Sequence, residues 1–474
     1  MQRHDPLPRF QRELSDWRLW LTRAVVILFA ALAGLTVLFF TWLGESALAL
    51  FSRGREACWW APLVWTPLCT VVIVHATRRW WPGAAGSGIP QVMAALDPTV
   101  PAGQRHLFVS LRLACAKVWL TAGGLLGGLS LGREGPSVQV AAGVMHAARH
   151  WLPAGAAVSP QGLLAAGGAA GIAAAFNTPL GGVMFAIEEL TRRPEQRSSG
   201  LLIAGIVLAG LVGVSFYGNG TYFGVIHVVE LTAALWWPAL LLALGCGVLG
   251  GLFSRLLVSS LAAPEPGRLS RWRSRRPLAF AAGCGLVVAI IGVVTAGAAF
   301  GGGYEHTQAL LRGTEATAGA EPAWLFAPLK LVATWLTTWA GVPAGIFAPS
   351  LSIGAAWGAD VARFSGLDAS HAPALIALGM AGFLAATTQA PLTAFIIVME
   401  MVDGHAMVLS LMACALVASG VSRLMSPPLY AALAAVQLGR LPAAPPEEPE
   451  EPGEPGAGER ADDEAQPASA ASSS

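Results

Sequence analysis

Charge is the scarcest feature of this sequence. Of its 474 residues, 12% are charged and 54% are hydrophobic, whereas a soluble protein carries about 25% charged residues. Lysine occurs only twice, at Lys117 and Lys330. Such a composition excludes a soluble enzyme. The apolar residues also recur along most of the chain, which excludes a protein held by a single membrane anchor.

Metal-binding and catalytic patterns are missing as well. The six cysteines stand singly in apolar segments without a CxxC pair, and the nine histidines show no ligand spacing. No triad or HExxH spacing is present, although Ser87, with His75 or His106 nearby, would be the best serine for an intramembrane enzyme. We therefore expect cysteines that serve packing, no metal, no cofactor, no enzymatic activity and no nucleic-acid partner.

What the sequence has instead is a series of apolar runs. Spanning a bilayer takes about 20 apolar residues, and some runs are long enough while others are short or interrupted by glycine and proline. Broken or re-entrant helices are tolerated only where protein or a watery cavity covers the freed backbone. The pattern predicts an all-α polytopic membrane protein, with apolar runs at about residues 24–50, 57–77, 113–131, 161–187, 201–216, 231–262, 278–300, 323–340, 344–358, 373–402 and 406–421.

The two ends of the chain differ from its body. Residues 1–23 carry five arginines and no small-residue cleavage pattern, so we expect a retained first helix and a cytoplasmic N-terminus. Basic stretches over 192–197 and 255–276 predict cytoplasmic loops by the same rule. Residues 441–474 hold nine acidic residues and one arginine among proline, alanine and serine, which predicts a disordered cytoplasmic tail.

An internal repeat organises the body. The segment KVWLTAGGLLGGLSLGREGPS (117–137) aligns with KLVATWLTTWAGVPAGIFAPS (330–350), which matches the two lysines of the chain to each other. Further on, GIAAAFNTPLGGVMFAIEEL resembles GFLAATTQAPLTAFIIVMEM. We expect a first membrane repeat over residues 24–216 and a second over 217–435. The matched pairs, 213 or 212 residues apart, are Gly132 and Gly345, Pro136 and Pro349, Ser137 and Ser350, Pro179 and Pro391, and Glu188 and Glu400.

The loops that follow the repeats indicate that the two halves are inverted. After Glu188 and Glu189 comes TRRPEQR, which is typical of a cytoplasmic loop, whereas MVDGHAM after Glu400 has no arginine or lysine. Equivalent segment ends on opposite membrane faces mean antiparallel repeats, a plan common among secondary transporters.

Glycine- and proline-containing motifs mark candidate helix starts. GREGP (132–136) and GIFAP (345–349) place proline where it fits the first helical turn, since no intrahelical bond is lost there. In inverted halves two such N-termini can face one site, and their free N–H groups favour a small anion. GSGIP (86–90) adds the hydroxyl of Ser87, and SPPLY (426–430) adds that of Tyr430. Any one glycine motif alone could serve helix packing instead.

These four motifs, in this order and spacing, resemble those of the CLC family of chloride channels and chloride/proton exchangers, over roughly residues 20–435. The resemblance implies two inverted-topology repeats of tilted, broken helices. It also implies a homodimer with one anion pathway per subunit, embedded in a lipid bilayer. With no appended regulatory domain in the sequence, we expect a multi-pass protein of a bacterial inner membrane with both termini in the cytoplasm.

The resemblance also assigns roles to residues. Ser87, Tyr430 and the backbone amides of Ile346 and Phe347 resemble the groups that hold the central chloride. Glu134 resembles the external gating glutamate, which occupies an anion position and swings away on protonation. Glu189 resembles the internal proton acceptor of the exchangers; channel members usually have an apolar residue there. The serine in GSGIP favours chloride over nitrate.

The remaining site residues are expected to support these groups. Gly132 and Gly135 flank the gate, and Arg133 braces the loop without binding chloride. Lys117 is a candidate to supply a long-range electric field along the anion path, and Lys330 is a weaker candidate. Glu400 is expected to be structural. One departure is that acidic residues of several bacterial exchangers are replaced after GSGIP by Gln91 and Met93, which bears on the surroundings of Glu189. Chloride/proton exchange is the favoured function, and a passive chloride channel of the same family is the alternative.

Overall fold

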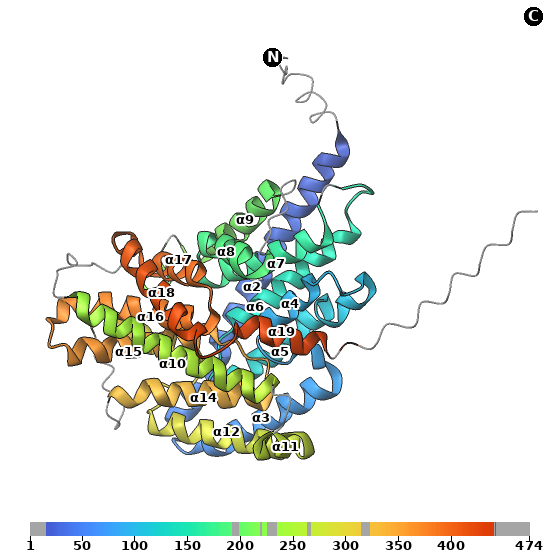
Figure 1. Cartoon of the computed structure of the whole chain (residues 1–474). Helices are drawn as coiled ribbons and strands as arrows, with labels where there is room; N and C mark the ends of the chain where they lie inside the picture. The colour runs from blue at the N-terminus through green and yellow to red at the C-terminus, as the bar shows by residue number, and fades with distance from the viewer. Residues whose placement is uncertain are drawn as a thin grey trace, which may run out of the picture. The chain divides into compact units, whose positions relative to one another are not determined.

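The computed structural model describes residues 16–156, 158–191, 199–218, 220–224, 235–262, 267–313, 323–439 and 441. Within these ranges the chain is helical, with no strand beyond one isolated bridge. The main helices (Figure 1) are α2 (Trp17–Ala57), α3 (Ala61–Trp80), α4 (Ile89–Leu96), α5 (Leu111–Leu126), α6 (Glu134–Ala147), α7 (Pro160–Phe176), α8 (Pro179–Phe185), α9 (Ser199–Tyr217), α10 (Trp236–Ala262), α11 (Arg268–Arg275), α12 (Pro277–Val294), α13 (Tyr304–Leu311), α14 (Phe326–Ala340), α15 (Phe347–Phe364), α16 (Ala372–Thr388), α17 (Pro391–Val402), α18 (Val408–Arg423) and α19 (Leu429–Leu438).

The helix lengths confirm the mixture that the apolar runs predicted. Among the described residues, five stretches are long and apolar enough to cross a membrane: 17–57, 102–126, 236–262, 277–294 and 405–423. The other apolar helices are shorter. Two of the predicted runs are each split, into α7 and α8 and into α16 and α17, at a residue with positive φ: Asn177 (φ 57°) and Gln389 (φ 60°). A proline begins the next helix in both cases, as expected for a residue without an N–H to donate.

The same helix pairs pack together in each repeat. The pairs α6–α7, α7–α9 and α2–α9 correspond to α15–α16, α16–α18 and α10–α18. Helices far apart in the sequence also lie side by side, as α3 and α12 do at the lower edge of Figure 1. The equivalence of these contacts shows that the sequence repeat is a structural repeat.

A single backbone bridge marks the relation between the halves. Gly132 and Gly345, which the repeat makes equivalent, pair in antiparallel sense. Gly132 N–H donates to Gly345 O at 2.8 Å, and Gly345 N–H donates to Gly132 O at 2.9 Å. Two equivalent residues that exchange the same two bonds lie on either side of a two-fold axis. The inverted repeat predicted from the loops is therefore present in the fold.

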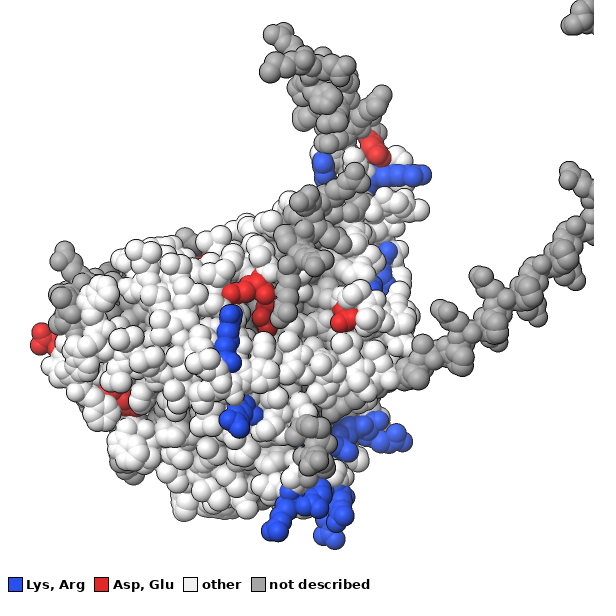
Figure 2. Space-filling model, viewed as in Figure 1, with Lys and Arg blue, Asp and Glu red and all other residues white. Residues whose placement is uncertain are grey.

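Part of the basic stretch 255–276, predicted to be a loop, is helical. Arg255 lies within α10, and Arg268–Arg275 form the short helix α11. Basic side chains gather at that edge of the molecule (Figure 2), and they are arginines because both lysines of the chain are buried. A long arginine side chain can run along a helix and keep its charged end in water, so a basic segment need not be a loop. The arginines before residue 16, the segment 192–198 and the tail from 442 lie outside the described residues.

Candidate functional site

All four motifs lie at the start of a helix, as predicted for GREGP and GIFAP. GSGIP precedes α4, GREGP opens α6, GIFAP opens α15 and SPPLY opens α19. Gly88 caps α4 with φ 109°, a conformation that favours glycine because it lacks a Cβ atom. Four helix N-termini, each with free N–H groups, are thus supplied by short segments spread over more than 300 residues.

These four N-termini converge in space. A Cβ atom added to Gly135 would overlap the Ser87 hydroxyl, and one added to Gly88 would lie 2.7 Å from Gly135 O. The Gly132–Gly345 bridge joins the loops before α6 and α15. The rings of Phe347 and Tyr430 stack at 6.3 Å between centroids with planes 8° apart, and α4 packs against α19. The glycines permit this close approach because they carry no side chain.

Two hydroxyl groups end in this region, and in the described part of the chain they approach each other without forming a hydrogen bond of normal geometry. Ser87 is 6% exposed and Tyr430 is fully buried, and neither Ser87 Oγ nor Tyr430 Oη is paired. The two side chains are close enough to interact. A buried hydroxyl left without a partner costs about 1–3 kcal/mol. Two buried donors at one point therefore favour a small acceptor between them.

The loop before α4 has its carbonyl groups turned toward donors. Gln139 Nε2 donates to Gly83 O at 3.0 Å and Gln91 Nε2 donates to Ala85 O at 2.5 Å. The fully buried Lys117 donates from Nζ to Ala84 O at 2.8 Å and Gly86 O at 2.6 Å. Four consecutive carbonyl oxygens, which would repel an anion, are thereby held by side chains. Lys117 reaches the site through this loop, and Lys330 binds Ala299 O and Gly301 O in the equivalent way.

The carboxylate of Glu134 is buried at the start of α6, with the residue 2% exposed. The backbone amides of Ala348 in α15 and of Arg133 and Glu134 itself approach the carboxylate, and Oε2 has no further partner in the described chain. A Cβ atom at Gly132 would overlap Oε2. The acidic group therefore sits where two opposed helix N-termini meet, the place that electrostatics favours for a negative charge.

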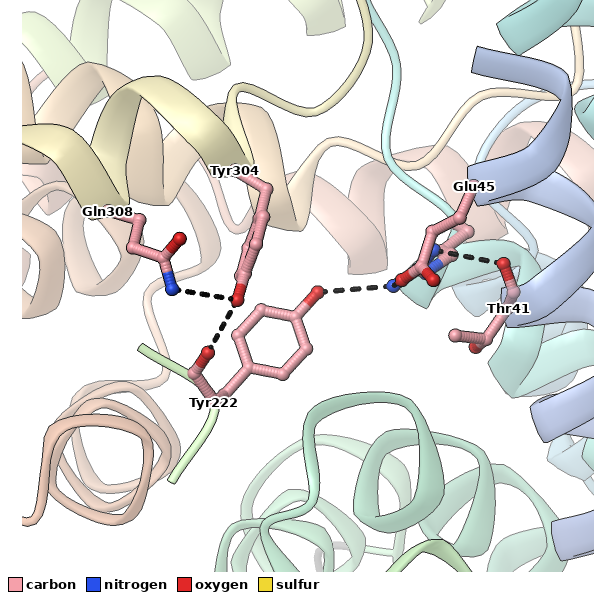
Figure 3. Close-up of polar contacts among 6 residues, drawn as sticks. Thr41, Glu45, Tyr222, Tyr304 and Gln308 are labelled. Carbon is pink, nitrogen blue, oxygen red and sulfur yellow. Dashed lines mark hydrogen bonds and ion pairs between the residues drawn. The ribbon is translucent and has the colours of Figure 1, made fainter. Parts of the chain in front are cut away.

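Arg133 forms an ion pair with Glu45 rather than with its neighbour Glu134. Its Nη2 lies 2.7 Å from Glu45 Oε1 and donates to the Tyr222 hydroxyl at 3.3 Å, while Nη1 donates to Thr41 O at 3.1 Å. Figure 3 shows the surrounding chain of contacts, in which Tyr304 Oη donates to Tyr222 O at 2.9 Å and Gln308 Nε2 donates to Tyr304 Oη at 3.2 Å. The loop that carries Glu134 is thus tied to α2 and α13. Sequence patterns gave no sign of Glu45, Tyr222, Tyr304 or Gln139.

Two cavities approach the site. The first, of about 1520 Å³, is lined by Glu134, Arg133 and Gly132 together with Tyr222 and Tyr304. The second, of about 890 Å³ and called here the Glu189 cavity, is lined by Ile187, Glu188, Glu189, Thr388, Gln389, Arg423, Leu424, Met425, Ser426, Pro427 and Pro428. The two cavities share no lining residue, and each contains one of the two predicted proton-handling glutamates.

Glu189 is buried in a π-helical turn, Ala186–Thr191, that follows α8. Such turns are rare and frequent at functional sites. Both Glu189 and Glu134 are near enough to Tyr430 to act electrostatically on its hydroxyl. Tyr430 therefore lies within electrostatic range of the two glutamates that face different cavities. In the described part of the chain, no three His, Cys, Asp or Glu side chains are grouped as metal ligands would be.

Glu188 and Glu400 each bind backbone amides of the other repeat. Glu188 accepts from Leu392 N–H (3.1 Å) and Thr393 N–H (2.6 Å) at the start of α17. Glu400 accepts from Leu180 N–H (3.1 Å) and Gly181 N–H (2.7 Å) at the start of α8. Glu188, just after α8, caps α17, and Glu400, near the end of α17, caps α8, so each carboxylate caps the equivalent helix of the other repeat. Both are anchors of the fold, which distinguishes Glu188 from its neighbour Glu189.

Comparison with known proteins agrees with this architecture. Among solved structures, a slow cyanobacterial Cl⁻/H⁺ antiporter superimposes with a TM-score of 0.72 at 24% identity, covering 89% of this chain and 98% of its own. A CLC-type fluoride/proton antiporter gives 0.67 at 21% identity, covering 88% and 98%. At these identities the likeness concerns the fold.

Relatives identified by sequence have a higher identity to this chain than these structures do. The H(+)/Cl(−) exchange transporter ClcA of Citrobacter koseri is 29% identical over 462 residues, 93% of each chain. ClcA of Cronobacter sakazakii is 30% identical over 392 residues, 81% of each. The family model described as voltage gated chloride channel matches residues 69–423. Together with the inverted repeat and the four converging helix N-termini, this match shows that the chain belongs to the voltage-gated chloride channel (CLC) family.

Proposed function

We propose that this protein is a secondary active transporter that exchanges chloride for protons across a membrane. The observation that carries the proposal is the position of Glu134: a buried carboxylate at the meeting point of α6 and α15, at the edge of one cavity, with Glu189 in the other. The relatives at 29–30% identity are named as H(+)/Cl(−) exchange transporters, which supports the same activity here.

The anion is held by dipoles rather than by a full positive charge. The hydroxyl groups of Ser87 and Tyr430 and the backbone amides of Ile346 and Phe347 replace the water that chloride loses on entering. Ile346 caps α15 and Phe347 is its first residue, so their N–H groups are among those without an intrahelical partner. Binding by neutral donors lets the ion leave again, which transport requires.

Glu134 acts as gate and as proton carrier. When ionised, its carboxylate takes an anion position at the helix N-termini, and protonation removes the charge that holds it there. Glu189 receives the proton from the Glu189 cavity. Because Tyr430 is in electrostatic range of both glutamates, chloride bound at its hydroxyl lies close to the proton route, so occupancy by the anion and movement of the proton influence each other. A carboxylate in a membrane interior is costly enough to mark function by default.

The alternative function is a passive chloride channel of the same fold. It requires the same anion site but gives Glu189 no role in transport. The buried position of Glu189, within electrostatic range of Tyr430, favours exchange, because a glutamate with no role would be replaced by an apolar residue at less cost.

Purified protein in liposomes tests the proposal. A chloride gradient is imposed, the voltage is fixed with a potassium ionophore, and external pH is recorded. We expect chloride movement to drive protons uphill, and Glu189→Ala to abolish the proton flux while chloride still moves. Chloride flux without any proton signal in the unaltered protein would make it a channel.

Assembly and location follow from the family resemblance. We propose a homodimer with one pathway in each subunit, embedded in the lipid bilayer of a bacterial inner membrane, with both termini in the cytoplasm. Mass measurement of the detergent-solubilised protein tests the dimer. Modification of single cysteines introduced near each terminus, by a reagent that does not cross membranes, tests the orientation.

A further inference from the structure

The Glu189 cavity holds one basic residue, Arg423, among its lining residues. Its two acids differ in their surroundings: Glu188 is committed to the amides at the start of α17, and Glu189 is buried. Arg423 is the last residue of α18 and is exposed. Its Nη2 donates to Gln389 O at 3.4 Å, and no described carboxylate lies within ion-pair distance of it.

The wall of this cavity leads directly to the anion site. After Arg423, the five residues 424–428 all line the cavity, and α19 then begins with Tyr430 as its second residue. Gln389 Nε2 fixes this segment by donating to Ser426 O at 2.8 Å. The same short segment therefore carries, at the cavity wall, a cation with no ion-pair partner among the described residues and, seven residues later, the buried hydroxyl of Tyr430.

We propose that Arg423 attracts chloride into the Glu189 cavity and so sets the chloride concentration from which the site is filled. The inference rests on the proposed transport function and names a residue that raises the rate of anion entry without touching the bound ion. A cation in a cleft with low-dielectric walls raises the local concentration of anions. One charge at roughly 5–10 Å gives a roughly 2- to 10-fold enrichment at low salt. The alternative role, a cation that only caps the C-terminus of α18, would leave chloride entry unchanged.

The test compares the chloride dependence of transport in liposomes, at low ionic strength and again with added impermeant salt. For Arg423→Gln we expect the apparent KM for chloride to rise roughly 2- to 10-fold at low salt, with kcat unchanged, because only recruitment is lost. The difference should disappear near 1 M salt, where the Debye length is about 3 Å. Arg423→Lys should keep the KM of the unaltered protein, since lysine carries the same charge.

The matched control is Arg268→Gln, which removes an equal charge from an exposed position on α11 that lines neither cavity. A second pair of variants leaves Arg423 and its contact with Gln389 in place. Leu424 lines the same cavity and is 88% exposed, so Leu424→Asp and Leu424→Lys should fold. We expect Asp to raise the chloride KM and Lys to lower it, with the same dependence on salt.

The possible results separate this inference from the proposed function. If the unaltered protein moves no chloride, the proposed function is wrong and Arg423 has nothing to recruit. If it moves chloride but Arg423→Gln and the Leu424 variants leave the KM unchanged, the recruitment role alone is overturned. An equal rise in Arg268→Gln, or a rise that added salt does not remove, would also overturn it.

Discussion

Glu188 and Glu400 form reciprocal helix caps, so the same prediction about stability applies to both residues. Each carboxylate accepts two backbone N–H bonds at the start of a helix from the other half. Glutamine at either position keeps the size and one acceptor oxygen, but it removes the charge and turns an NH₂ group toward an N–H group. We therefore expect Glu188→Gln and Glu400→Gln to destabilise the protein by similar amounts.

The magnitude follows from the bonds lost. A hydrogen bond to a charged group contributes about 1.5–3 kcal/mol, and a charge at a helix N-terminus adds about 0.3–1 kcal/mol. Both glutamates are half-buried, which screens part of this, so we expect about 2 kcal/mol for each variant, or a factor of about 30 in the unfolding equilibrium. Because α8 packs against α17, the double variant should show a non-additive loss.

Thermal unfolding in detergent, followed by tryptophan fluorescence, measures the effect. Glu305→Gln is the control, because Glu305 is exposed in the first turn of α13 and its carboxylate caps no described helix. Both cap variants should unfold at clearly lower temperatures than this control. If either cap variant unfolds at the same temperature as Glu305→Gln, the carboxylates do not anchor the two helices and the reasoning is refuted.

Three further predictions concern the site itself. Gly135→Ala places a methyl group against the Ser87 hydroxyl and should abolish chloride transport in a folded protein, whereas Gly103→Ala, which meets nothing within 4 Å, should transport normally. Lys117→Met removes the Nζ donor from Ala84 O and Gly86 O, leaving Gly86 O with the Ala344 N–H alone, and should weaken chloride binding at least 10-fold by calorimetry; unchanged binding would show that those carbonyls do not affect the site. Glu45→Gln removes the charge paired with Arg133 and, because Glu45 is 55% exposed, should cost about 1–2 kcal/mol of stability in thermal unfolding, while a Glu56→Gln control should cost none.

The sequence predicted the elements well and the contacts between them poorly. Repeat equivalence and proline position located the starts of α6 and α15, because both are local signals. The ion-pair partner of Arg133 could not be located in this way. The true partner, Glu45, lies 88 residues earlier on α2, and no local pattern connects the two positions.

The same limit applies to the roles of the repeated residues. Glu400 was expected to be structural, but the helix that it caps lies 220 residues away in the other half. Likewise, Lys117 was considered for a field acting on the ion, whereas the structure shows it bonded to the loop before Ser87. Such partners depend on how the halves pack, which the repeat alone does not specify.

The two-fold relation between Gly132 and Gly345 has a consequence for direction. The next equivalent pair but one is Glu134 and Phe347, the first residues of α6 and α15. The two halves are thus related when the framework is turned over, but one presents an acid and the other an aromatic ring that no change of pH can ionise. Glu189 likewise has Met401 as its equivalent, so a framework with two related ends is given a front and a back by a few differences in side chain.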